Sequence, residues 1–189
     1  MNTANKLTML RIFLIPVFLV VLYLDFPFHM LFALAIFILA SVTDFVDGYI
    51  ARHYNLVTDF GKFMDPLADK MLVMSALLWF VEMGRFPAWA LLIVVVREFA
   101  VTGLRLLAVE RGRVIAAAWS GKVKTASTMV CICLMLVFVH PVLDGVCIAL
   151  IIGTTIYSGV EYFAKNKDVI DWSKVQCWPF PNAWTPNGR

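Results

Sequence analysis

The chain has 189 residues, of which 61% are hydrophobic and only 15% are charged, and its mean hydropathy is +0.83. Soluble proteins are about half apolar and about a quarter charged, so a water-soluble fold of this size cannot bury so many apolar side chains. The composition therefore excludes an ordinary soluble domain and indicates that lipid surrounds much of the chain. The net charge of +3 is informative only through its distribution along the sequence.

Six apolar stretches follow one another along the chain, each close to the roughly 20 residues that a helix needs to cross the hydrocarbon core. Short segments with turn or polar residues separate them, as at 25–27, 55–62, 83–87, 111–113 and 140–141. The pattern predicts an all-α membrane protein with six transmembrane helices. We expect these helices at residues 7–24, 28–50, 66–81, 88–109, 123–139 and 143–163.

The distribution of lysine and arginine predicts the orientation, because cytoplasmic loops of membrane proteins are enriched in both. With both termini in the cytoplasm, Arg85 is the one such residue in an outer connection and Arg97 lies within a span, while the others fall on the inner side. We expect one membrane domain over 1–167. Its continuation, 168–189, carries tryptophans among prolines and is expected to lie along the inner membrane surface.

Four carboxylates gather where the second and third spans meet the inner face. Asp44 and Asp47 are spaced i,i+3 near the end of one predicted helix, and Asp65 and Asp69 are spaced i,i+4 at the start of the next. Residues with these spacings share a helix face, and the short connection makes the two helix ends neighbours. Since charged residues in spans are costly, the group predicts a functional site on one side of the membrane.

Four adjacent carboxylates repel one another unless a cation lies between them, and oxygen ligands favour hard ions such as Mg²⁺, Mn²⁺ or Ca²⁺. Gly48 and Ala51 continue the face of the first pair and leave space for a ligand, while Arg52 is a candidate phosphate donor. Gly61 is expected in the connecting loop, where it permits close backbone approach. The alternatives are solvated helix ends or an ion or proton pathway, which would place acids at mid-bilayer and on both sides.

The arrangement of these residues resembles the signature of the CDP-alcohol phosphatidyltransferase family. Written out, it is Asp44-x-x-Asp47-Gly48-x-x-Ala51-Arg52, eight residues, then Gly61-x-x-x-Asp65-x-x-x-Asp69. The resemblance implies transfer of a phosphatidyl group from CDP-diacylglycerol to an alcohol, with release of CMP. It also implies two Mg²⁺ or Mn²⁺ ions as cofactors, a homodimer, and a place in the bacterial cytoplasmic membrane.

The resemblance also assigns roles to individual residues. It makes Asp44, Asp47 and Asp65 metal ligands and makes Asp69 the general base, with Asp69 also able to touch a metal ion. The residues that it assigns to the CDP-diacylglycerol donor are Asp47, Gly48, Ala51, Arg52 and Gly61. The run Asn5, Thr8 and Arg11 resembles the segment that opens many family members beside the nucleotide. The alternative for this run is an anchor of the first helix at the membrane interface.

Several cations near the site indicate an anionic acceptor, for which we expect glycerol 3-phosphate. Arg97 and Arg105 lie eight residues apart, near one face of the fourth span, and Lys122 and Lys124 lie at the inner end of the fifth. The two segments resemble those of bacterial family members that use glycerol 3-phosphate. In the alternatives, Arg97 pairs with Glu98 or another acid, and the lysines are ordinary inner-face anchors.

Other acceptors and another class of function remain open. Inositol phosphate is also a phosphorylated alcohol, and serine or phosphatidylglycerol would keep the same reaction. A divalent-cation carrier or a proton-coupled carrier would use the same acids without transferring any group.

Overall fold

The computed structural model describes residues 3–24, 26–53, 59–110 and 118–167, with side chains described at 9–24, 26–43, 68, 70–109 and 118–167. These residues form six α-helices and no strand. The helices are α1 (Thr3–Tyr23), α2 (His29–His53), α3 (Asp59–Glu82), α4 (Ala88–Glu110), α5 (Trp119–Val137) and α6 (Pro141–Lys165). The tail predicted at 168–189 lies outside the described residues.

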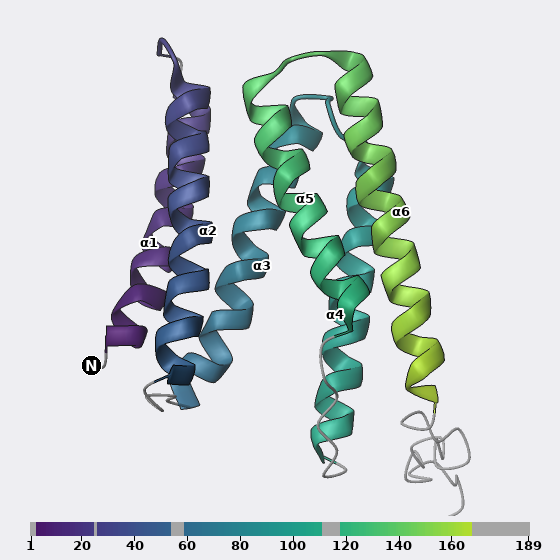
Figure 1. Ribbon diagram of the computed structural model, residues 1–189. Coiled ribbons are helices and arrows are strands. Elements are labelled where there is room, and N and C mark those ends of the chain that lie inside the picture. The colour runs from purple at the N-terminus through teal and green to yellow at the C-terminus, as the bar shows by residue number, and fades with distance from the viewer. Residues whose placement is uncertain (1–2, 25, 54–58, 111–117, 168–189) are drawn as a thin grey trace, which may run out of the picture.

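The helices lie side by side in one bundle, each running opposite to the one before it (Figure 1). The start of α1 and the end of α6 lie at one end of this bundle, together with the end of α2 and the start of α3 (Figure 1). We call this the motif end. α1 packs against α2 and α3, α5 against α6 and α2, and α4 against α6.

The prediction of an all-helical chain with six helices is confirmed within the described residues. Three predicted helix starts are wrong by four residues or more: α1 begins at Thr3 instead of residue 7, α3 at Asp59 instead of residue 66, and α5 at Trp119 instead of residue 123. Gly61 therefore lies inside α3, and its predicted place in the connecting loop is wrong. Hydropathy marks only the part of a helix that lipid surrounds, whereas the hydrogen-bonded helix continues into water.

Within the described residues, α5 and α6 are long and apolar enough by themselves to cross a membrane. The described apolar parts of α1 and α2 are shorter, at Met9–Tyr23 and His29–Thr43. In α4, Arg97, Glu98 and Arg105 interrupt the apolar sequence. α5 and α6 thus suggest a membrane protein, whereas α4 carries charged residues within its length.

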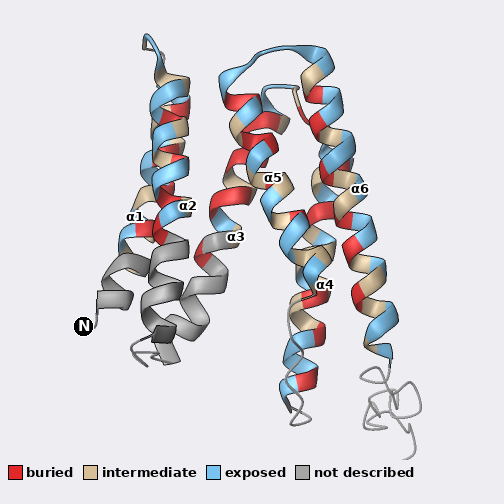
Figure 2. Cartoon of the chain, in the orientation of Figure 1, coloured by how far each residue is buried: buried red, intermediate tan, exposed pale blue. Residues whose placement is uncertain are grey.

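The exposed surface of the helices is largely apolar, as in a protein whose solvent is lipid. Figure 2 shows buried residues on one side of each helix and exposed residues on the other. The exposed side includes Phe13, Phe99 and Tyr157, each with about two thirds or more of its surface accessible. Contiguous apolar surface of this kind is rare on soluble monomers and marks contact with a membrane or a partner.

The buried side chains form one main core that all six helices share. Phe18 of α1 and Phe37 of α2 are fully buried with their ring centroids 5.8 Å apart, and Phe80 of α3 is equally buried. A smaller cluster joins α4 to α6 nearer the motif end, around Leu104 and Tyr162. These contacts keep α4 against α6, which positions the charged residues of α4.

A buried ion pair joins the connection between α3 and α4 to the start of α6, at the end of the bundle opposite the motif end. Arg85 follows a turn at Gly84, whose φ of 69° suits glycine. The guanidinium of Arg85 donates to both carboxylate oxygens of Asp144 at 2.8 and 2.7 Å, and to the Phe138 carbonyl at 2.8 Å. The side chains of Arg85 and Asp144 are only 12% and 11% exposed. The pair thus ties the turn between α3 and α4 to the first turn of α6.

Replacing Asp144 with alanine is expected to destabilise the folded protein, because it leaves the Arg85 charge buried without its carboxylate. Removing one partner of a buried pair costs about 3 kcal/mol. A clear fall in the thermal midpoint of the detergent-purified protein would show this. Glu161→Gln is the matched control, since Glu161 pairs with the exposed Lys165 one turn away and such pairs contribute little. Equal midpoints for both variants would contradict the prediction.

Candidate active site

The four motif aspartates lie on two helices that meet at the motif end. Asp44 and Asp47 belong to the last part of α2, and Asp65 and Asp69 to the first part of α3. The two helices contact each other, and Figure 1 shows the end of one beside the start of the other. The neighbouring helix ends that the sequence predicts are therefore present.

The side chains of these aspartates lie outside the described ones, so their roles as metal ligands and base stay predictions. The same holds for the other motif residues and the start of α1, namely Gly48, Ala51, Arg52, Gly61, Asn5 and Thr8. Among the side chains that are described, no three histidines, cysteines or acids gather in a way that could hold a metal ion.

Arg11 connects the first helix to the motif helix. Its side chain is fully buried, and its Nε donates to the carbonyl oxygen of Ala40 at 3.4 Å. Ala40 precedes Asp44 by four residues, about one helical turn. The guanidinium of Arg11 therefore contacts α2 about one turn before Asp44, toward the middle of that helix.

Arg97, Glu98, Lys124 and Ser158, from α4, α5 and α6, form what we call the interior ion cluster. Oε1 of Glu98 accepts from Nη1 of Arg97 at 2.8 Å and from Nζ of Lys124 at 2.6 Å. Nη2 of Arg97 donates to Oγ of Ser158 at 2.9 Å. The three charged side chains are 13%, 14% and 6% exposed, so all three are largely removed from solvent.

Two glycines lie beside Arg97, and one of them leaves room that a side chain would fill. A Cβ added to Gly159 of α6 would lie 3.3 Å from Cγ of Arg97, and one added to Gly121 of α5 would lie 3.7 Å from Nη2. The first distance is tighter than most real contacts, so α6 can approach the arginine this closely because residue 159 has no side chain. The absence of a side chain at Gly159 therefore lets the side chain of Arg97 fit between α4 and α6.

The other two cations of the predicted acceptor site contact aromatic rings. Nε of Arg105 donates to the hydroxyl of Tyr162 at 3.1 Å, and its guanidinium lies 5.5 Å from the centre of that ring. The ammonium of Lys122 lies 5.8 Å from the ring centre of Trp119. Glu98 therefore connects Arg97 to Lys124. Arg105 and Lys122 instead contact aromatic side chains at separate places near the motif end.

A small cavity of about 20 Å³ lies between the interior ion cluster and α3. Glu98, Lys124 and Thr125 line it from α4 and α5, and Lys70 lines it from α3. A cavity of this size holds about one water molecule. Because Lys70 directly follows Asp69, the ion cluster lies beside the segment of α3 that carries the motif.

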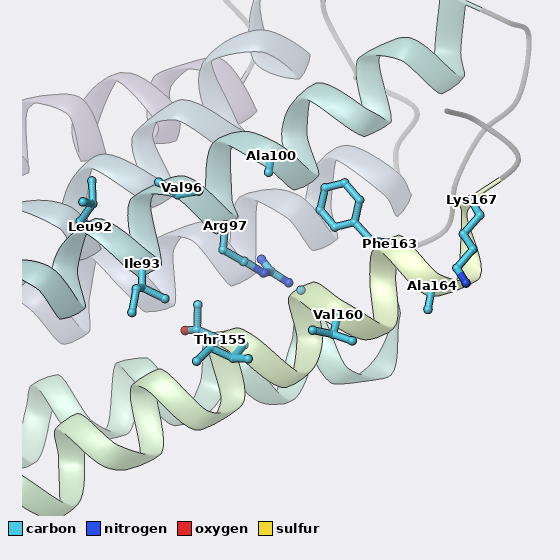
Figure 3. A pocket seen from close by; sticks show the side chains of 12 residues that line it. Leu92, Ile93, Val96, Arg97, Ala100, Thr155, Val160, Phe163, Ala164 and Lys167 are labelled. Carbon is cyan, nitrogen blue, oxygen red and sulfur yellow. The ribbon is translucent and has the colours of Figure 1, made fainter. Parts of the chain in front are cut away.

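A much larger groove, about 1050 Å³, runs between α4 and α6. Figure 3 shows Ile93 and Val96 on one wall and Val160 and Phe163 on the other, with Arg97 between the two helices. Nearly all of its lining is apolar. The groove can accommodate a hydrocarbon chain, and it offers few polar groups to a small water-soluble molecule.

A family model described as CDP-alcohol phosphatidyltransferase matches residues 1–157. This match includes α1 to α5, most of α6 and the complete aspartate motif. The chain belongs to the CDP-alcohol phosphatidyltransferase family.

Curated relatives in the CDP-alcohol phosphatidyltransferase family match over most of the chain. The CDP-diacylglycerol–glycerol-3-phosphate 3-phosphatidyltransferase of Bacillus subtilis (strain 168) is 40% identical over 190 residues, covering 91% of this chain and 98% of that protein. A probable phosphatidylglycerophosphate synthase of Mycobacterium tuberculosis (strain ATCC 25618 / H37Rv) is 42% identical, covering 87% and 81%. A transferase of Salmonella paratyphi A (strain ATCC 9150 / SARB42), named as in Bacillus subtilis, is 38% identical, covering 71% and 76%.

Three residues around the site of this phosphatidyltransferase were not among the predicted site residues. The sequence offers Glu98 only as an alternative partner of Arg97, and that ion pair is present. Its second bond, to Lys124, joins residues 26 positions apart and has no signal in the sequence. Ser158 is 61 residues from Arg97. Lys70 had a signal, since it directly follows Asp69.

Proposed function

We propose that this chain transfers the phosphatidyl group of CDP-diacylglycerol to sn-glycerol 3-phosphate, giving phosphatidylglycerophosphate and CMP. The names of the relatives from Bacillus subtilis and Mycobacterium tuberculosis support this reaction. The observation that carries the choice of acceptor is the interior ion cluster, which lies beside the motif segment of α3.

The charge of this cluster favours an anionic acceptor. Arg97 and Lys124 contribute two positive charges and Glu98 one negative charge, so the cluster carries a net charge of +1. A buried charge without compensation is unfavourable, and an anion that binds beside it removes the imbalance. Glycerol 3-phosphate supplies such an anion, whereas serine, as a zwitterion, carries no net charge to offset it. Arg105 and Lys122 would add attraction at the motif end.

In the proposed reaction, a hydroxyl of glycerol 3-phosphate attacks the β-phosphorus of CDP-diacylglycerol. The new phosphorus–oxygen bond forms as the bond to CMP breaks, and Asp69 accepts the proton of the hydroxyl. Asp44, Asp47 and Asp65, with Asp69, would hold two divalent cations, Mg²⁺ or Mn²⁺. Their carboxylates match the oxygen ligands that these ions prefer, and the bound ions would neutralise charge on the phosphate oxygens.

We assign the donor to the helix ends around the motif. Asp47, Gly48, Ala51, Arg52 and Gly61 would accommodate the cytidine diphosphate group. Asn5, Thr8 and Arg11 would approach it from α1, and the position of Arg11 against α2 supports this assignment. The acyl chains would remain in the bilayer beside the apolar surface of the helices.

The proposed topology has six spans, both termini in the cytoplasm, and an active site facing the cytoplasm of a bacterial inner membrane. The start of α1, the end of α6 and the helix ends that carry the motif lie at the same end of the bundle (Figure 1), which supports this topology. An even number of alternating helices returns the chain to the side on which it began. We further propose a homodimer, on family resemblance.

The test is CMP release from CDP-diacylglycerol by detergent-purified protein with Mg²⁺ and one acceptor at a time. Release with glycerol 3-phosphate, and much less with inositol phosphate, serine or phosphatidylglycerol, is the expected result. A preference for another alcohol would support a phosphatidyltransferase but contradict glycerol 3-phosphate as its acceptor. Folded protein that releases no CMP with any acceptor, and that moves cations into liposomes, would instead be a carrier.

A further inference from the structure

Glu98 is the one carboxylate in the interior ion cluster, and a single oxygen of it contacts two cations on different helices. Oε1 of Glu98 accepts one hydrogen bond from the guanidinium of Arg97 on the same helix and one from the ammonium of Lys124 on α5. Because the bonds are short and the three side chains are mostly buried, water competes weakly for these charges. The position of the Lys124 ammonium therefore depends on Glu98.

Arg97 has further support, whereas Lys124 depends more on this carboxylate. Nη2 of Arg97 donates a hydrogen bond to Ser158, and Gly159 lets α6 approach its side chain closely. A lysine side chain has four flexible methylene groups and ends in a point charge with three donors. Within the described part of the chain, the bond to Glu98 uses one of those donors. The other two can serve a ligand.

We propose that Glu98 is a positioning residue for the acceptor, which holds the ammonium of Lys124 where it binds the phosphate of glycerol 3-phosphate. The inference rests on the proposed function. Without Glu98, the ammonium is repelled by Arg97 and by Lys70, which lines the same small cavity. It then occupies several positions, and the phosphate subsite loses its geometry. Glu98 itself does not touch the substrate, since a carboxylate repels a phosphate.

The test compares steady-state CMP release by wild-type protein and Glu98 variants in mixed micelles, with each substrate varied in turn. Glu98→Ala is expected to raise the KM for glycerol 3-phosphate by about tenfold or more, since small displacements of a binding group are costly. The KM for CDP-diacylglycerol should stay within about twofold. Glu98→Gln should cause a smaller rise than alanine, because its amide oxygen still accepts both hydrogen bonds.

A double-variant cycle separates positioning from a general structural role. If Glu98 acts through Lys124, the variant with both Glu98→Ala and Lys124→Met has nearly the same KM for glycerol 3-phosphate as Lys124→Met alone. Independent, multiplicative effects would overturn the proposal. Should the alanine variant not fold, the same cycle is made with Glu98→Gln. Glu82→Gln, at the other end of the bundle, is the matched control and should leave both KM values unchanged.

The outcomes also distinguish this inference from the proposed function. Wild-type protein without activity toward glycerol 3-phosphate would remove the proposed function itself. Active wild-type protein with an unchanged KM in Glu98→Ala would remove only the role of Glu98. A rise in both KM values together with a lower thermal midpoint would show that Glu98 merely supports the fold, and would equally overturn the inference.

Discussion

Asp69→Asn is expected to lower the rate of CMP release by about 10³-fold, within the range in which general bases contribute to catalysis. Asparagine has nearly the shape of aspartate, and its amide cannot accept the proton of the attacking hydroxyl. Binding of CDP-diacylglycerol should persist, because the other three aspartates remain. The measurements are single-turnover CMP release and equilibrium binding of the donor to the same purified variant.

The control for this variant is Glu82→Gln, which also neutralises an acid of α3 but lies at its opposite end. Its rate should equal that of the wild-type protein. Normal turnover of Asp69→Asn would remove Asp69 as the base. Loss of donor binding along with turnover would make its main role that of a metal or donor ligand.

Removal of divalent cations is expected to abolish CMP release, and Mg²⁺ or Mn²⁺ should restore it. The reason is electrostatic, because four carboxylates at two adjoining helix ends would otherwise repel the phosphates of the donor. The measurement is activity after treatment with a chelator and gel filtration, followed by titration with each metal.

Direct binding of Mn²⁺ provides a readout that does not depend on activity. Wild-type protein should bind about two ions per chain, as expected for a two-metal site. A variant with Asp44→Asn and Asp47→Asn should bind fewer. Full activity after the chelator, in protein shown to be metal-free, would contradict both the metal site and the roles proposed for the aspartates.

The helices and the motif could be predicted from local patterns. Apolar runs near 20 residues long indicate membrane helices, and the aspartates with Gly48, Ala51 and Arg52 have spacings that place them on helix faces. The start of α3 could not be predicted this way. The first turns of α3, from Asp59, carry charged residues, so the apolar pattern begins later than the helix does. Backbone hydrogen bonds do not depend on the hydropathy of the side chains, so a helix can extend beyond its apolar part.

The sequence by itself determined the membrane character of this protein, its six helices and its phosphatidyltransferase motif, because these depend on composition and on spacing within one or two helices. The tertiary structure alone decided that Glu98 also binds Lys124, and that Arg85 pairs with Asp144. The Glu98–Lys124 contact joins residues 26 positions apart on two helices, and the Arg85–Asp144 contact joins a turn to a helix 59 positions away. Such pairs depend on how helices pack against each other, and the local pattern of any one helix does not contain that information.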